Sequence, residues 1–435
     1  MTATATQNLG EFSLDFQYLT VTKVTVNGAP APFELVDAKP HLTGATQPVK
    51  LVVTPPEGIL DGEQFTVDVH YRGEPVEIID PDGSSEGWVP ACIGVATPLT
   101  CDGGVVVNEP VGAAGWFPNN NVPTDKATYR TAITTPDSHT ALGNGELTSK
   151  QPLPGGEAKW TWTESNPMAS YLTTATVGDF IYTEDTIDET TPPARTIPAY
   201  WAIDSDATPP QQTGLEASFA RVESMINFLG GLYGPYPFDS AGAIADNVPT
   251  LGYALEVQTK PVFAFLSAND ETMLHEQAHQ WFGDSVSPTQ WTDIWFNEGW
   301  AEWSTWYWAN LENGATDTPA DIFDDNYASA SASDWSVPPA TLNGDPALLF
   351  DHFSTYVRAP MMLEGLRQII GDTKFFAFAK DIMGTYGGGN ITTQQFIDLA
   401  KQDSGLSGAD LTLLNTYFQQ WLYGNVKPTV LPSSF

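Results

Sequence analysis

A short histidine motif and a distant glutamate constrain this 435-residue chain more than any other feature. The sequence reads His-Glu-Gln-Ala-His at 275–279, and eighteen residues separate His279 from Glu298. Two histidines four positions apart project from the same face of a helix, so both imidazoles can bind one metal ion. A carboxylate from a second helix completes three protein ligands and leaves a fourth position for water. The pattern predicts one zinc ion per chain, bound by His275, His279 and Glu298.

Glu276 follows the first histidine directly, so its side chain projects differently from the two predicted ligands. It is better placed to accept a proton from a zinc-activated water, as a general base, than to bind the metal. An interpretation as two ordinary helix histidines would leave Glu298 unexplained. The flanking sequence predicts one helix that is capped by Asp270 and ends at Gly283, and a second over about 293–310. The second helix carries large aromatic residues that we expect in the core: Trp295, Phe296, Trp300, Trp303, Trp306 and Trp308.

Longer stretches around the motif resemble one enzyme family. HEQAHQWFGD at 275–284 and DIWFNEGWA at 293–301 are similar to the aminopeptidase-N family of zinc metallopeptidases, the gluzincins with H-E-x-x-H-x18-E. Three further segments resemble that family in the family's order: GYALE at 252–256, NEP at 108–110 and YVRAP at 356–360. The resemblance extends over roughly residues 8 to 424 and implies a zinc-dependent aminopeptidase that acts on peptides with a free N-terminus.

The resemblance also implies roles for residues outside the zinc motif. Tyr356 would donate a hydrogen bond to the oxyanion, and Glu256 and Glu109 would bind the free ammonium group through charge-assisted hydrogen bonds. The substrate-binding segment would also include Gly252, Tyr253 and Ala254. This chain departs from the family pattern in having Leu255 for Met, Val257 for Asn and Ala359 for Gly. We expect the missing Asn to affect the positioning of substrate and not the metal chemistry.

Composition narrows the class of protein and its partners. Acidic residues number 53 against 17 basic ones, a formal charge of −36, which argues against nucleic-acid binding because phosphate contacts need clustered Lys and Arg. No apolar run is long enough for a transmembrane helix, and the first residues do not resemble a signal peptide. Cys92 and Cys101 are predicted to form a disulfide, with two free thiols as the alternative. The disulfide suits a secreted or extracellular protein. The oligomeric state stays unassigned.

The order of sequence patterns predicts a multidomain protein, β structure first and then α+β. Alternating strands and a hairpin-type Asn27-Gly28 turn indicate an N-terminal antiparallel β-sandwich or saddle domain over 1–187. Helical periods then indicate a thermolysin-like, mainly helical catalytic domain over 188–435. The Pro-rich stretch 186–195 is expected to be the linker, and 313–345 a long surface excursion.

Compared with the resembled family, we expect a short form of the enzyme. The β domain is expected to lack its first strands, and the chain ends soon after its last predicted helix, without the C-terminal helical domain of larger members. In the family that domain helps to close the substrate chamber, so the resemblance implies a more open site.

A few further residues are candidates for supporting roles. Asp284 and Asp293 are candidate acceptors that would orient the metal-binding histidines. We expect Arg358 to pair with an acidic side chain, with contact to substrate carbonyls as the alternative.

Three functions are alternatives to a zinc aminopeptidase. A gluzincin endopeptidase would share the metal site without the amine anchors, so Glu256 and Glu109 argue against it. A non-catalytic peptide-binding protein would not need Glu276 or Tyr356. Nothing in the sequence singles out an epoxide-opening activity, which one branch of the resembled family has.

Overall fold

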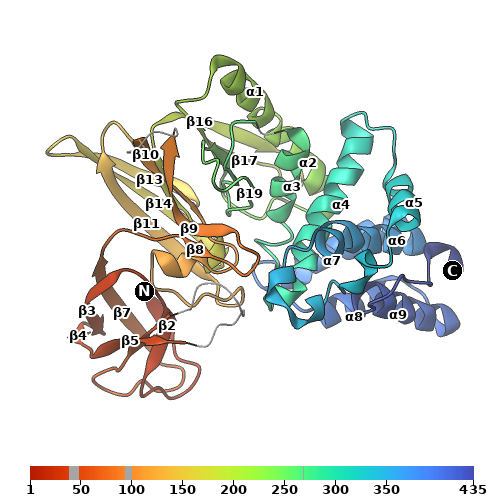
Figure 1. Ribbon diagram of the computed structural model, residues 1–435, viewed down its shortest axis with the longest axis horizontal. Coiled ribbons are helices and arrows are strands. Elements are labelled where there is room, and N and C mark those ends of the chain that lie inside the picture. Colours follow the sequence, from red (N-terminus) through yellow and green to blue (C-terminus); the bar gives the residue numbers. More distant parts are fainter. Residues whose placement is uncertain (39–48, 94–99, 268) are drawn as a thin grey trace.

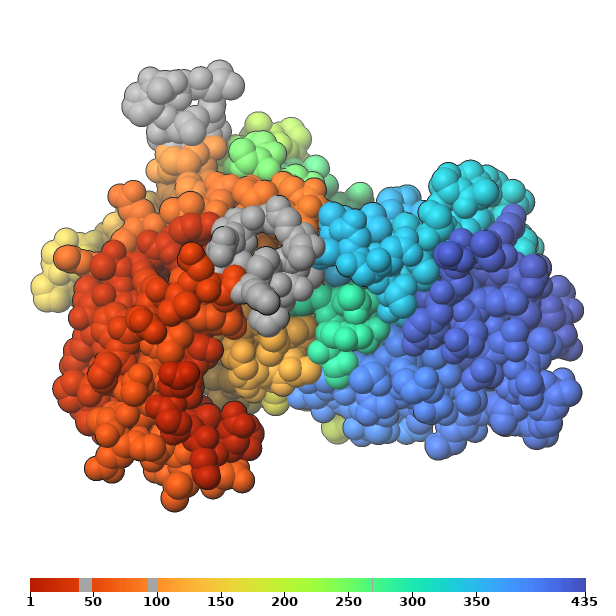
Figure 2. All heavy atoms as spheres, turned by 60° about the horizontal axis from the view of Figure 1, so that its bottom comes forward, coloured from red at the N-terminus to blue at the C-terminus, as the bar shows by residue number. Residues whose placement is uncertain are grey.

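The computed structural model describes residues 1–38, 49–93, 100–267 and 269–435. The chain begins in β-sheets and ends in helices, with the N- and C-termini at opposite ends of the molecule (Figure 1). A space-filling view shows the N-terminal β structure on one side of the molecule and the C-terminal helices on the other (Figure 2). The predicted order, a β-rich domain followed by a mainly helical one, is confirmed.

Two small antiparallel sheets form the N-terminal lobe and enclose a core that includes Phe16, Leu51 and Val67. The first sheet has the order β1 (Thr2–Thr4), β7 (Gln64–Arg72), β3 (Thr20–Val26) and β4 (Ala29–Pro30). The second has the order β2 (Phe12–Asp15), β6 (Val49–Val53) and β5 (Phe33–Asp37). The β3–β4 turn is formed by Asn27 and Gly28, both with positive φ, as the sequence predicts.

A second β region lies between this lobe and the helices. Its five-stranded sheet has the order β12 (Thr140–Gly143), β15 (Ala175–Gly178), β10 (Thr100–Val107), β9 (Ser85–Ile93) and β8 (Ile78–Ile79). A three-stranded sheet has the order β11 (Ala127–Pro136), β14 (Glu157–Met168) and β13 (Glu146–Leu153). Cys92 on β9 lies opposite Cys101 on β10, and the two form the predicted disulfide. Strand β10 leads directly into Asn108 and Glu109, so this sheet carries one candidate anchor towards the site.

A separate five-stranded sheet, here called the catalytic sheet, carries the other candidate anchor. Its first hairpin contains the stretch that was expected to be the linker. Its order is β16 (Phe180–Glu189), β17 (Arg195–Asp204), β18 (Ala241–Ala245), β20 (Val262–Phe263) and β19 (Ala254–Leu255). Strands β16 and β17 are paired from Phe180 opposite Asp204 to Glu189 opposite Arg195. Residues 186–195 therefore form the end of a hairpin, and their interpretation as a linker was wrong. Because β16 runs across 187, we propose a domain boundary near Asp179.

Helices cover this sheet and build the C-terminal lobe. They are α1 (Pro209–Phe219), α2 (Val222–Tyr233), α3 (Asp270–His279), α4 (Trp295–Glu312), α5 (Pro319–Ser329), α6 (Ala359–Ile370), α7 (Asp372–Tyr386), α8 (Thr393–Asp403) and α9 (Gly408–Leu422). The six aromatic residues of α4 that were predicted to be in the core are buried, and Trp300 stacks on Phe282. The expectation of a surface excursion over 313–345 was only partly right, because this segment contains α5 and the fully buried Trp335. Among the described residues, no helix combines the length and apolar character needed to span a membrane.

Candidate active site

Helix α3 presents both motif histidines on one side. The helix is capped by Asn269, whose side chain accepts a hydrogen bond from the Thr272 backbone N–H, so the cap lies one residue before the expected Asp270. The rings of His275 and His279 lie 4.8 Å apart between centroids. The helix ends at His279, four residues before Gly283, which adopts a φ of +133°. A Cβ at Gly283 would lie 3.3 Å from Nδ1 of His279, so glycine here keeps the turn clear of the ring.

The three predicted zinc ligands converge between α3 and α4. Nε2 of His275 lies 3.1 Å from Oε2 of Glu298, and Nε2 of His279 lies 3.4 Å from the same oxygen. Two donors bound to zinc at about 2.0–2.1 Å with tetrahedral angles lie roughly 3.3 Å apart, so these separations fit a zinc ion. All three side chains are largely buried, and burial without a cation would leave a carboxylate facing two imidazole nitrogens.

The far side of each imidazole has an acceptor that fixes the ring. Nδ1 of His279 lies 3.1 Å from the backbone oxygen of Phe282, and Nδ1 of His275 lies 3.3 Å from Oε2 of Glu302. Acceptors at Nδ1 place the proton there and leave both Nε2 lone pairs free for a metal. The donor set therefore fits zinc.

These contacts correct the expected roles of Asp284 and Asp293. The carboxylate of Asp284 is buried and has no hydrogen-bond partner among the described residues. Asp293 instead accepts a hydrogen bond from the hydroxyl of Thr393 at 2.7 Å. Neither aspartate orients a histidine. The carboxylate that lies against Nδ1 of His275 is that of Glu302, and its position one helical turn after Glu298 is a signal that the sequence analysis missed.

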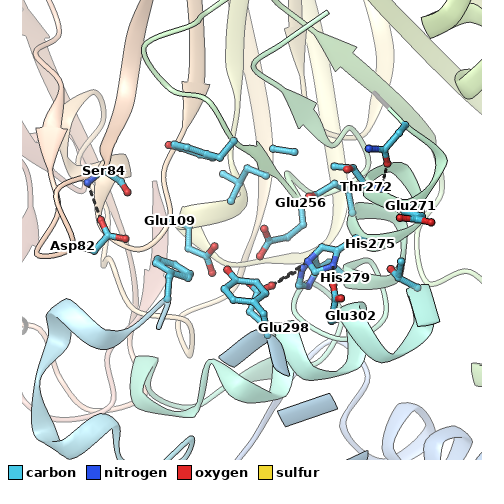
Figure 3. A pocket seen from close by; sticks show the side chains of 18 residues that line it. Asp82, Ser84, Glu109, Glu256, Glu271, Thr272, His275, His279, Glu298 and Glu302 are labelled. Atoms are coloured by element: carbon cyan, nitrogen blue, oxygen red, sulfur yellow. Dashed lines mark hydrogen bonds and ion pairs between the residues drawn. The ribbon is translucent and has the colours of Figure 1, made fainter. Parts of the chain in front are cut away.

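The two candidate amine anchors approach the metal ligands from β structure (Figure 3). Glu109 follows β10, and its neighbour Asn108 is held by bonds to the backbone oxygen of Thr173 at 2.6 Å and from the indole of Trp116 at 2.9 Å. Glu256 follows β19, and its backbone oxygen accepts a hydrogen bond from the Gln280 side chain at 3.1 Å. Figure 3 shows the two carboxylates pointing towards each other beside the histidines.

Each candidate anchor has a carboxylate oxygen, Oε1, that is buried without a hydrogen-bond partner among the described residues. Burial raises the pKa of Glu109 well above its ordinary value, and the charge of Glu256 raises it further. Burial also raises the pKa of Glu256. Two desolvated carboxylates that face one cavity favour a cationic ligand that can donate hydrogen bonds.

Glu276 and Glu298 lie in the same cavity but differ in electrostatics. Burial raises the pKa of Glu276 to about 7, although the two histidines oppose the shift. Burial also acts to raise the pKa of Glu298, but the neighbouring His279 and the close contacts with both imidazoles outweigh it and lower this pKa to about 2. Glu298 thus stays ionised, as a ligand must, while Glu276 titrates near neutral pH, where a proton carrier is most effective.

Tyr356 faces the zinc ligands from a short π-helical segment, Ser354–Arg358, that precedes α6. Its ring centroid lies 6.4 Å from that of His275. Burial and the surrounding carboxylates raise the pKa of Tyr356 well above its ordinary value, so the hydroxyl keeps its proton and can donate it in a hydrogen bond. The prediction for Arg358 was wrong. This side chain is fully buried and donates to backbone oxygens of Trp421, Trp335, Val337, Gln420 and Gly424.

The predicted zinc ligands, Glu276, Tyr356 and the predicted substrate-binding residues other than Gly252 line one cavity of about 480 Å³. Gly252 lies in the turn before β19 with a φ of +70°, and the hydroxyl of Tyr253 is bonded to the backbone oxygen of Ser85 at 2.7 Å. That bond attaches the segment to the start of β9. The preceding β8–β9 turn brings Asp82 and Ser84 to one end of the cavity. No motif in the sequence pointed to these two residues.

Comparisons with known proteins agree with the fold. Residues 263–426 match the model of the peptidase family M1 domain, and residues 104–172 match the peptidase M1 N-terminal domain. The crystal structure of an M1 zinc metallopeptidase from Deinococcus radiodurans is similar with a TM-score of 0.80 and 26% sequence identity, over 99% of this chain and 89% of that one. The chain therefore belongs to peptidase family M1 and has the fold of the M1 zinc metallopeptidase from Deinococcus radiodurans.

Two curated relatives show how much of the chain and of each relative the similarity covers. Aminopeptidase N of Acetobacter pasteurianus is 28% identical over 207 residues, which are 45% of this chain and 56% of the relative. Aminopeptidase M1-B of Oryza sativa subsp. japonica is 24% identical over 337 residues, 72% of this chain and 37% of the relative. The chain thus spans only part of the length of these relatives.

Proposed function

We propose that this protein is a zinc-dependent aminopeptidase that removes N-terminal residues from peptides and binds one zinc ion per chain. The observation that carries the proposal is the pair of buried carboxylates, Glu109 and Glu256, each with an unpartnered oxygen beside the zinc-ligand set. A free ammonium group satisfies both carboxylates, and a blocked N-terminus leaves them buried and unpaired. The names of the Acetobacter and rice relatives, both aminopeptidases, support this proposal.

In this proposal His275, His279 and Glu298 hold the zinc ion. Zinc, when bound there, supplies Lewis acidity and makes water a good nucleophile near neutral pH. Glu276 accepts the proton of the attacking water and passes it to the nitrogen of the leaving amine. Its buried carboxyl, with a pKa near 7, suits both halves of that transfer. The hydroxyl of Tyr356 donates a hydrogen bond to the oxyanion that develops on the scissile carbonyl.

Glu109 and Glu256 fix where the chain is cut. Because they bind the first amino group next to the zinc ligands, only the first peptide bond reaches Glu276. Tyr253 and Ala254, with Asp82 and Ser84, would surround the first side chain. A gluzincin endopeptidase is the alternative, and it is disfavoured because a peptide that continued past Glu109 and Glu256 would bury both carboxylates without a cation. A secreted or extracellular location remains a prediction from composition and the disulfide.

One peptide in two forms tests the function. The zinc-loaded protein is incubated with the peptide carrying either a free or an acetylated N-terminus, and the products are identified by mass. We expect stepwise loss of single residues from the free form alone, abolished by a chelator and restored by zinc. Internal cleavage of both forms would instead identify an endopeptidase. Zinc binding without cleavage of several unrelated peptides would favour the peptide-binding alternative.

A further inference from the structure

The two motif histidines are oriented by chemically different acceptors. His279 faces a backbone oxygen, that of Phe282, which is neutral and fixed by the turn after α3. His275 faces the side chain of Glu302, which is ionisable and partly exposed. A backbone carbonyl cannot be altered by substitution, but a side chain can. The orientation of His275 can therefore be changed by a single substitution at Glu302, which is not one of the predicted zinc ligands.

Glu302 is itself held in place on α4. Its Oε2 lies 3.3 Å from Nδ1 of His275, and its Oε1 accepts a hydrogen bond from the indole N–H of Trp306 at 2.8 Å. Glu298, Glu302 and Trp306 are spaced four residues apart, so they lie along one face of the helix. One face of α4 thus supplies a ligand, the carboxylate behind a second ligand and the donor that orients that carboxylate.

We propose that Glu302 is a positioning residue that fixes the ring and the Nδ1 proton of His275, and thereby strengthens the zinc site. The inference rests on the proposed zinc binding by His275, His279 and Glu298. A carboxylate behind a ligating imidazole holds the tautomer whose Nε2 is free, and it increases electron donation to the metal. Trp306 contributes indirectly, because its indole limits Glu302 to the rotamer that reaches His275.

The test measures the zinc dissociation constant by competition with a chromophoric chelator. We expect Glu302→Ala to weaken zinc binding by about 10- to 100-fold, the usual effect of removing such a partner. Glu302→Gln keeps an acceptor oxygen but lacks the charge, so its affinity should fall between those of Glu302→Ala and the unaltered protein. Glu271→Gln is the matched control: Glu271 is an acidic residue on the same cavity wall, for which the described contacts include neither histidine, and its loss should leave zinc affinity unchanged.

A double-mutant cycle separates positioning from a loss of packing. Trp306→Phe alone should weaken zinc binding by only a few-fold. Added to Glu302→Ala, it should weaken binding no further, because both changes break the same contacts from Trp306 through Glu302 to His275. Equal and additive losses would assign Trp306 a separate packing role and overturn its place in the proposal. The visible spectrum of the cobalt-loaded protein should change in Glu302→Ala, because the ring of a ligand turns.

The outcomes of this test and of the function test are distinguishable. If the unaltered protein binds zinc tightly and Glu302→Ala binds it equally well, the role of Glu302 is wrong and the proposed function stands. If the unaltered protein does not bind zinc, the proposed function itself fails. Thermal unfolding of the metal-free variants identifies any that are misfolded, and for these the Glu302→Gln measurement decides.

Discussion

The candidate site joins two halves that differ in how the chain builds them. The zinc-ligand half comes from α3 and α4, which follow one another closely in sequence and pack directly together. The anchor half comes from the end of β10 and from β19, which belong to different sheets. The zinc-ligand half depends on helical spacing. The anchor half depends on the packing of the second β region against the catalytic sheet, which contains β16–β20.

This difference indicates that the chemistry and the choice of substrate can be altered separately. Substitutions in the zinc-ligand half should reduce turnover whatever the substrate. Substitutions in the anchor half should change the response to a free amino group and leave zinc bound. The following four predictions test that separation, in order of decreasing effect.

The largest effect is expected for Glu276→Gln. The amide cannot accept the proton of the attacking water, so kcat should fall by about 10²- to 10⁴-fold while the zinc content of the protein stays the same. Steady-state kinetics and metal analysis on one preparation measure both quantities. Near-normal turnover in the zinc-loaded variant would remove Glu276 from the role of base.

Tyr356→Phe should come next, with kcat lower by roughly 100- to 1000-fold and little change in KM. Only the hydroxyl is removed, and its hydrogen bond is needed mainly in the transition state. Tyr253→Phe is a matched control, because that hydroxyl is bonded to the backbone oxygen of Ser85 at the start of β9. An equal loss of kcat in both variants would point to disturbed packing in place of oxyanion binding.

Glu256→Ala breaks the anchor half. We expect kcat/KM on free-amine peptides to fall by about 10- to 100-fold, the range for loss of a hydrogen bond between charged groups. Zinc affinity should be unchanged, because Glu256 is not among the predicted ligands. Unchanged kinetics on free-amine substrates would exclude Glu256 as an anchor, and loss of zinc would show that the two halves are not separable.

The smallest effect concerns pH. The pKa of Glu109 is raised by burial and by the charge of Glu256, so this carboxyl regains its proton at a higher pH than an exposed glutamate does. Its negative charge, and with it the attraction for an ammonium group, is present above that raised pKa and is lost as the pH falls through it. KM for a free-amine peptide should therefore rise several-fold towards acid pH. Glu109→Gln should have a higher KM that no longer rises as the pH falls. If KM of this variant still rose towards acid pH, a group other than Glu109 would be responsible.

The zinc-ligand half was predictable from residues alone because its information is local. The helical period places His275 and His279 on one face, and α3 and α4 lie within a few residues of their expected limits. Glu302 could have been found by the same spacing. Glu109 and Glu256 could be named only by resemblance, since no local pattern brings β10 and β19 together.

The wrong predictions concern features that depend on contacts between distant segments, which composition and local sequence do not reveal. A polar, Pro-rich hairpin end has the same composition as a linker, so 186–195 could not be recognised from composition as a turn between two long paired strands. A buried arginine that donates to backbone oxygens, as Arg358 does, has no signature in sequence, because its partners are main-chain atoms of distant segments. Asp284 and Asp293 were plausible by proximity in sequence, but the carboxylate of Asp284 has no hydrogen-bond partner among the described residues and that of Asp293 is bonded to Thr393.

One crystallographic measurement tests the central claim, that two separately built halves meet on one peptide N-terminus. The zinc-loaded Glu276→Gln variant would be crystallised with a free-amine tripeptide, with data collected on both sides of the zinc absorption edge. The account predicts one zinc peak bound by His275, His279 and Glu298, and the peptide nitrogen in contact with Glu109 and Glu256. A peptide bound with its nitrogen away from both glutamates, or a metal held by other residues, would contradict it.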